Sequence, residues 1–246
     1  MDQLLVALDV ESSERAMQLV NALHDLAGGF KIGNRLFTRE GPTLVRRITD
    51  AGSRVFLDLK YHDIPNTVEQ AVEAAVGTGA WMINVHSSGG MAMMQAAARA
   101  ARDTSAKLGR QTPLMIGVTV LTSMDQQALQ SIGVERPVLE QVLALARMTK
   151  EAGLQGVVAS AQETPEIRKA CGPDFQIVTP GIRGAAERSI ADDGTGRRDQ
   201  GRRELSRGWK ANHRRSGPPR GRCSDCRRAD DGYFAVMMKC PRRFMV

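Results

Sequence analysis

The sequence predicts an α/β fold, a (β/α)8 TIM barrel in which strands one to seven are recognisable. Over residues 1–183, short apolar runs alternate with helix-like runs, which is typical of a parallel sheet with helical crossovers. Seven such strands fit a barrel lacking its last strand better than an open doubly wound sheet. Several of the strands also end in polar or charged residues, as expected at the C-terminal rim of a barrel. An eighth strand and its helix are not recognisable.

The elements follow from hydrophobic periodicity. The strand candidates are Leu4–Val10, Gly29–Gly33, Arg54–Lys60, Trp81–Ser87, Leu114–Val120, Gly156–Ser160 and Phe175–Ile182. The helix candidates are Ser13–Ala27, with an apolar stripe that includes Leu26, the Ala- and Val-rich Thr67–Gly77, and Pro137–Gly153. The methionine-rich run at 89–101 indicates helix packing in the core rather than a ligand site.

The segment LDLKYHDIPNT at 57–67 places three charged groups, Asp58, Lys60 and Asp63, after an apolar strand. Side chains alternate between the two faces of a strand, so Phe56, Asp58 and Lys60 share one face. That face changes from apolar to ionic as the strand ends. A structural ion-pair network that caps the strand explains such a triplet equally well when the triplet is taken alone.

Neighbouring strands repeat this pattern. Ala7 and Asp9 share a face, as do Gly29, Lys31 and Gly33, and as do Met82, Asn84 and His86. We expect Asp9 and Lys31 to lie near Asp58 and Lys60. Two carboxylates and two ammoniums packed together tune each other's pKa values. Such a network suits a reaction in which one ammonium delivers a proton while carboxylates repel a substrate anion.

Six segments resemble the orotidine 5′-phosphate decarboxylase family of the bacterial type. They are VALDV (6–10), FKIG (30–33), DLKYHDIPNTV (58–68), NVHSSGG (84–90), VTVLTS (118–123) and TPGIR (179–183). The resemblance covers about three quarters of the chain, and DLKYHDIPNT is its most specific part. It implies a decarboxylase that converts orotidine 5′-phosphate (OMP) to UMP and CO2 in pyrimidine biosynthesis, without a cofactor or metal, as a homodimer.

The resemblance also implies roles for residues that match by position. Lys60 would protonate C6 of the pyrimidine, Asp58 and Asp63 would crowd the substrate carboxylate, and Lys31 would hold the network and contact the ribose. Asp63 would act in the active site of the partner subunit. The implied substrate-binding residues are Asp9 at the ribose hydroxyls, Thr67 across the dimer interface, Thr122 and Ser123 at the base, and Arg183 at the phosphate. We interpret His62 and His86 as structural histidines.

The net charge of +7 is concentrated in the last quarter of the chain. Residues 184–246 contain 16 Lys and Arg, 14 of them Arg, against 8 Asp and Glu. This division predicts a barrel domain at 1–183 and an aberrant basic, disordered segment at 184–246. The phosphate-binding glutamine and the Gly-Arg-Pro turn implied by the resemblance are missing from it. Back-translation of 201–213 with a one-base offset yields an apolar strand followed by Gly-Arg-Pro, so we hypothesise a frameshift near codon 184. A protein that keeps this tail is expected to fold poorly and to be nearly inactive.

Three alternatives remain open. A metal-dependent 3-keto-gulonate-6-phosphate decarboxylase has a similar Asp-x-Lys-x-x-Asp arrangement, although the neighbouring HDIPNT favours the pyrimidine enzyme. The Arg-rich tail could instead bind RNA, but nothing in residues 1–183 supports a nucleic-acid partner. Cys223, Cys226, Cys240 and His213 form a weak zinc pattern. The chain has neither a membrane-spanning run nor a signal-peptide pattern, and we expect a cytoplasmic protein.

Overall fold

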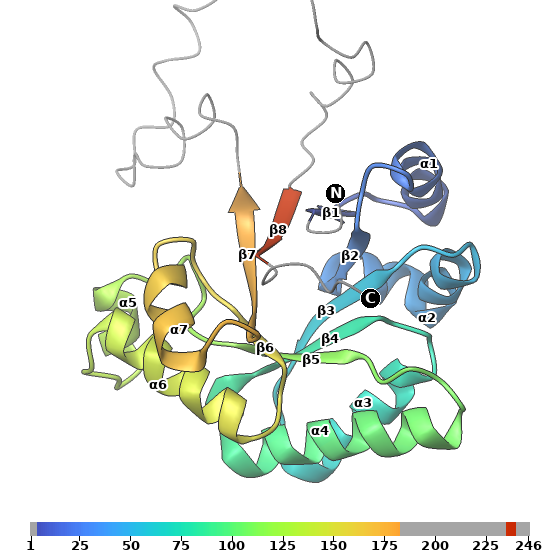
Figure 1. Cartoon of the computed structure of the whole chain (residues 1–246). Coiled ribbons are helices and arrows are strands. Elements are labelled where there is room, and N and C mark those ends of the chain that lie inside the picture. Colours follow the sequence, from blue (N-terminus) through green and yellow to red (C-terminus); the bar gives the residue numbers. More distant parts are fainter. Residues whose placement is uncertain (1–3, 183–234, 240–246) are drawn as a thin grey trace, which may run out of the picture. The chain divides into compact units, whose positions relative to one another are not determined.

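The computed structural model describes residues 4–182 and 235–239, and in it eight strands form a closed barrel in the order β1 to β8 (Figure 1). The strands are β1 (Leu4–Ala7), β2 (Gly29–Gly33), β3 (Val55–Tyr61), β4 (Met82–His86), β5 (Leu114–Val118), β6 (Gly156–Val158), β7 (Gln176–Ile182) and β8 (Ala235–Lys239). Strands β1 to β7 pair in parallel with their neighbours in sequence. The predicted barrel class is confirmed.

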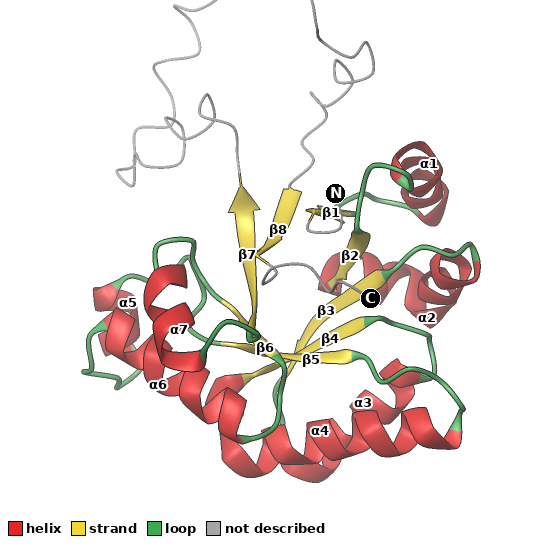
Figure 2. Cartoon of the chain, in the orientation of Figure 1, coloured by secondary structure: helices red, strands yellow, loops and turns green. Residues whose placement is uncertain are grey.

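The helices connect successive parallel strands and lie outside the sheet (Figure 2). They are α1 (Ser13–Leu23), α2 (Asn34–Asp50), α3 (Pro65–Val76), α4 (Gly90–Lys107), α5 (Gln126–Ser131), α6 (Val138–Glu151) and α7 (Thr164–Cys171), with a 3₁₀ turn η1 (Ser87–Gly89) before α4. The three predicted helices correspond to α1, α3 and α6. The predicted end of the first helix is wrong, because α1 stops at Leu23 and Leu26 beyond it is 47% exposed.

Local chemistry fixes several helix starts and one kink. Ser12 Oγ accepts a hydrogen bond from the Arg15 N–H at the start of α1, and Asp125 caps α5 in the same way. Pro65 is the first residue of α3, a position where a backbone N–H would have no partner within the helix, so the N–H that proline lacks costs no helical hydrogen bond. Gly41 interrupts α2 with a φ of +66° directly before Pro42, so this helix is kinked.

The core has an inner and an outer layer. Inside the barrel, one cluster of buried apolar side chains comes from β1, β3, β4, β5 and β7: Leu5, Ala7, Phe56, Met82, Ile116 and Val178. The outer layer packs the other faces of the strands against the helices and includes Met93 and Met94, which are fully buried. The core assignment of the methionine-rich run is therefore confirmed. Phe56 points from β3 into the barrel interior, and side chains alternate along a strand, so the next inward position on β3 is Asp58.

Strand β8 corrects one expectation. The sequence predicted no ordered strand within 184–246, yet Ala235–Lys239 pairs antiparallel with both β7 and β1. The physical reason is that β1 and β7 would otherwise leave backbone N–H and C=O groups unpaired at the two sheet edges. An antiparallel strand differs from the parallel eighth strand of a regular (β/α)8 barrel. Residues 183–234 and 240–246, including Arg183, His213 and the cysteines of the weak zinc pattern, lie outside the described residues.

Within the described residues, no helix combines the length and the apolar content that a membrane span requires.

Candidate active site

Charged side chains gather where the first strands of the barrel end. Lys31 lies in β2, Asp58 and Lys60 lie in β3, and Asp9 follows β1 by two residues. The parallel register aligns these strand ends, with Ala7 opposite Lys31 and Gly33 opposite Asp58. The structure therefore brings together the four residues that strand alternation predicted to be neighbours. This is the rim at which barrels of this class place their chemistry.

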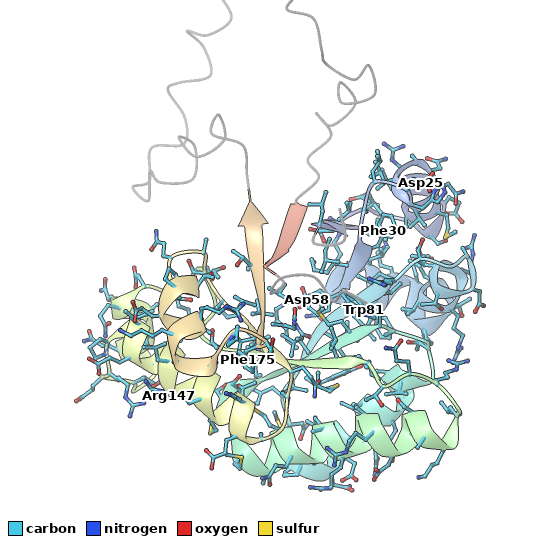
Figure 3. All side chains as sticks on the ribbon, in the orientation of Figure 1. Asp25, Phe30, Asp58, Trp81, Arg147 and Phe175 are labelled. Atoms are coloured by element: carbon cyan, nitrogen blue, oxygen red, sulfur yellow. The ribbon has the colours of Figure 1, made fainter. Side chains whose placement is uncertain are left out.

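Asp58, labelled in Figure 3, is the centre of the network. Its Oδ1 atom accepts hydrogen bonds from Lys60 Nζ at 2.7 Å and from Asn84 Nδ2 at 2.7 Å. Its Oδ2 atom lies 3.3 Å from Lys31 Nζ. The residue is only 8% exposed, so two ammoniums and an amide replace the water that the carboxylate loses on burial.

Lys31 links the buried carboxylate to the more exposed one. Its Nζ atom lies 3.8 Å from Asp9 Oδ1 as well as 3.3 Å from Asp58 Oδ2. Side-chain exposure rises along this chain of contacts, from 12% at Asp58 and 13% at Lys31 to 45% at Asp9. The charges of the two carboxylates and of the two lysines balance, so the loss of any one of them leaves a net charge in a partly buried site.

Lys60 has an unusual backbone. Its φ is +53°, and among the described residues it is the one non-glycine residue with a positive φ. The register between β3 and β4 shifts between Leu57 and Tyr61, so Lys60 lies within a bulge of β3. Bulges of this kind redirect a side chain next to active sites. The Lys60 side chain is 30% exposed, so its ammonium meets both the Asp58 carboxylate and the open rim.

His86, at the end of β4, faces His62, with the ring centroids 5.3 Å apart. Burial lowers the pKa of His86, and the nearby His62 and the Lys60 ammonium lower it further. A neutral imidazole avoids adding a third positive charge beside the two lysines. The interpretation of His62 and His86 as structural residues stays a prediction.

Asp63 and Thr67 lie apart from the charged network. Both are exposed, and Asp63 Oδ1 accepts a hydrogen bond from the Ile64 N–H. Among the described residues, no ion pair joins Asp63 to Lys31 or to Lys60. All six residues of 62–67 are exposed, including Ile64 at 65%. Within its own chain, the printed contact of the Asp63 carboxylate is thus with the neighbouring backbone N–H and not with the lysines of the network.

The predicted base-binding residues occupy another loop. Thr122 and Ser123 form an exposed turn after β5 and before α5. The predicted phosphate ligand, Arg183, lies outside the described residues.

Asn84 is the site residue that the sequence analysis did not propose. It was placed on the inward face of its strand without a role, yet its amide contacts both Asp58 and the Lys60 backbone. The available signal in the sequence was a polar residue, Asn84, flanked by Ile83 and Val85 in a strand. Among the described residues, no group of three or more His, Cys, Asp or Glu side chains could hold a metal ion.

Comparison with known protein families gives the chain a family match. Residues 2–206 match the model of the family described as "Orotidine 5'-phosphate decarboxylase / HUMPS family". The chain belongs to this family. The resemblance of the sequence motifs to orotidine 5′-phosphate decarboxylases is therefore confirmed at the level of the family.

Individual members of the family agree. The chain is 53% identical to the orotidine 5′-phosphate decarboxylase of Moorella thermoacetica over 185 residues, which are 75% of this chain and 73% of the relative. The crystal structure of the same enzyme from Lactobacillus acidophilus superposes with a TM-score of 0.68 at 36% identity, covering 73% of this chain and 80% of the other. The Methanocaldococcus jannaschii orotidine 5′-monophosphate decarboxylase, complexed with the inhibitor BMP, gives 0.59 at 26% identity, covering 75% and 79%.

Proposed function

We propose that the chain decarboxylates OMP, forming UMP and CO2 without a cofactor or metal, as a step of pyrimidine biosynthesis. The observation that carries the proposal is the Lys60 ammonium held 2.7 Å from the buried Asp58 carboxylate at the rim of a barrel of this family. A cation is thereby fixed beside a buried anion before any substrate arrives. Preorganised charge of this kind stabilises a developing carbanion without reorganisation during the reaction.

The proposed reaction proceeds in two linked events. The substrate carboxylate lies against Asp58, and like-charge repulsion destabilises the bound ground state. The bond between C6 and the carboxylate breaks, CO2 leaves, and the electron pair stays on C6. Lys60 Nζ stabilises this carbanion and gives it a proton, and the resulting neutral amine is protonated again from water.

The remaining residues bind the substrate in this proposal. Asp9 and Lys31 contact the ribose, which agrees with the position of Asp9 at the more exposed end of the network. Thr122 and Ser123 contact the base from their exposed turn, and Arg183 binds the phosphate. Binding of the phosphate, which is remote from the reacting carbon, supplies free energy for the unfavourable carboxylate contacts.

We further propose that the active unit is a cytoplasmic homodimer in which Asp63 and Thr67 reach the partner's site. The support is that residues 62–67 are all exposed and that, within the described residues, no ion pair joins Asp63 to the lysines of its own chain. An exposed carboxylate next to an exposed isoleucine is well suited to an interface between copies.

A substrate comparison tests the function. The purified full chain, of verified mass, and the same chain with the frame restored after Arg183 are each assayed with OMP and with 3-keto-gulonate-6-phosphate, with and without EDTA. We expect loss of OMP that EDTA does not change, faster in the frame-restored chain. Turnover of the keto sugar phosphate that EDTA abolishes, with no turnover of OMP, contradicts the proposal and supports the metal-dependent alternative.

A further inference from the structure

Asn84 occupies a position that no substrate-contacting role explains. It lies on β4, its exposed fraction is 0%, and its side chain points to β3. A buried primary amide in a barrel interior is costly unless its donors and acceptor are satisfied. Both of its partners are parts of the charged network, which indicates a role in that network rather than in the apolar core.

The orientation of the Asn84 amide is fixed by the chemistry of its partners. Asp58 Oδ1, as a carboxylate oxygen, accepts a hydrogen bond from Asn84 Nδ2 at 2.7 Å, and the Lys60 backbone N–H donates to Asn84 Oδ1 at 2.8 Å. A backbone N–H can only donate, and an ionised carboxylate can only accept. A rotated amide would make both contacts repulsive. One side chain therefore holds the main chain of Lys60 and the carboxylate of Asp58 at the same time.

The bulge in β3 explains why the Lys60 backbone needs this partner. Between Leu57 and Tyr61 the register with β4 is broken, so the regular ladder does not provide an acceptor for the Lys60 N–H. The positive φ of Lys60 is unfavourable for a residue with a Cβ atom. Such a conformation persists only where the surroundings hold it. Asn84 Oδ1 is the acceptor that does so.

We propose that Asn84 is a positioning residue for the decarboxylation. It locks Lys60 in its left-handed backbone conformation and orients Asp58 so that Oδ1 meets the Lys60 ammonium while Oδ2 faces Lys31. A closed ring of contacts results, from the Lys60 N–H through Asn84 and Asp58 back to Lys60 Nζ. The inference deepens the proposed function and rests on it for its kinetic consequence, but the hold on the Lys60 backbone is independent of any substrate.

Two variants separate positioning from general stability. Asn84→Ala removes both contacts. Thr78→Ala is the matched control, because Thr78 is also buried, at 4% exposure, and its hydroxyl donates to the Ala75 carbonyl, which has no part in the charged network. Both variants are expected to lower the melting temperature, so a kinetic change that is confined to Asn84→Ala does not follow from lost stability.

The first measurement needs no activity. In frame-restored chains labelled with ¹⁵N-lysine, hydrogen exchange of the Lys60 amide is followed by NMR, with the resonance assigned from a Lys60→Arg variant. We expect exchange at least about tenfold faster in Asn84→Ala and unchanged in Thr78→Ala, because the acceptor is lost only in the former. Equal Lys60 exchange in wild type and Asn84→Ala overturns the proposal.

The second measurement is the turnover of OMP by the frame-restored chain. We expect kcat to fall about 10- to 100-fold in Asn84→Ala while KM changes less than about threefold, since a misplaced ammonium weakens transition-state stabilisation and leaves substrate contacts intact. A kcat equal to that of wild type, or a loss confined to KM, overturns the proposal. If wild type fails to turn over OMP while the Lys60 amide responds as expected, the proposed function is wrong and the positioning of Lys60 stands.

Discussion

Lys60 shows how a single residue combines strain and charge. Its positive φ is unfavourable for a residue with a Cβ atom, and its ammonium lies 2.7 Å from a carboxylate that is 12% exposed. Neither feature favours the folded state by itself: the left-handed backbone is unfavourable, and burying an ion pair costs desolvation on both partners. Strain and buried charge at one residue, at a barrel rim, are what a site preorganised for electrostatic catalysis requires.

His86 gives a residue-scale prediction for pH. The pKa of His86 is lowered below its ordinary value of 6.5 by burial first, then by His62 and Lys60. Below about pH 6.5 the unfolded chain therefore binds a proton at this position more readily than the folded chain does. As a result, the free energy of unfolding is higher above that pH and decreases as the pH falls below it.

The test compares urea unfolding at about pH 7.5 and about pH 5.5. We expect wild type to lose more unfolding free energy on acidification than His86→Asn does. The control is His24→Asn, which removes an exposed histidine directly after α1, outside the charged network, and measures the effect of losing a histidine elsewhere in the chain. Identical pH dependence in wild type and His86→Asn would show that His86 makes no such contribution.

At the scale of elements, strand alternation carried the prediction of the site. Asp9, Lys31 and Asp58 were expected together because inward positions of adjacent parallel strands meet at one rim. In the structure, both carboxylates lie within 3.8 Å of the Lys31 ammonium. The bulge at Lys60 was not predictable, because alternation assumes a regular strand. Asn84 was missed for the same reason, since its acceptor role exists only where the ladder is broken.

Other elements were missed for local reasons. The helix α2 contains Gly41 and Pro42, which are usually read as breakers, and the structure accommodates them as a kink between helical segments. The strand β8 is a run of five residues within an arginine-rich segment, and short apolar runs carry little information about pairing direction. The roles of Asp63, Thr67, Thr122, Ser123 and Arg183 stay predictions.

The close approach of β6 and β7 gives an element-scale prediction. Gly156 pairs with Gln176, and a Cβ at Gly156 would overlap the backbone carbonyl oxygen of Gln176. Backbone cannot move aside as a flexible side chain can, so Gly156→Ala should lower the unfolding free energy by about 1–3 kcal/mol. Gly77→Ala is the control, because Gly77 has helical φ and ψ of −60° and −16° and should change stability by less than about 1 kcal/mol. Equal stability of Gly156→Ala and wild type in urea would contradict the packing described for this strand pair.

For the whole molecule, the proposed sharing of the active site between subunits predicts complementation. Lys60→Ala and Asp63→Ala should each be nearly inactive alone. After mixing and reassociation, hybrid dimers contain one intact site, so random pairing should restore about a quarter of the activity of wild type. Lys60→Ala mixed with Asp58→Ala is the control, since these residues contact each other within one chain and no hybrid has an intact site. No recovery in the first mixture would mean that Asp63 does not act across subunits.

The C-terminal segment raises the question of the reading frame. The parallel strands end at Ile182, and similarity to the Moorella thermoacetica enzyme spans 185 residues of this chain. The change in composition at Gly184 follows directly after the end of β7, while the family match extends to residue 206. We propose a frameshift near codon 184 in the gene or in its recorded sequence. Resequencing is expected to restore a strand followed by Gly-Arg-Pro, and independent reads of an uninterrupted frame would reject the proposal.

The central claim is that the Lys60 ammonium, held by Asp58, drives the loss of CO2 from OMP. The most direct measurement is kcat/KM for OMP in the frame-restored chain and in its Lys60→Ala and Lys107→Ala variants, the latter of which removes an exposed lysine at the end of α4. We expect kcat/KM to fall at least about a thousandfold in Lys60→Ala, because the variant loses both the proton donor and the charge that stabilises the carbanion, and not to change in Lys107→Ala. Turnover by Lys60→Ala within about twofold of the frame-restored chain would contradict the claim.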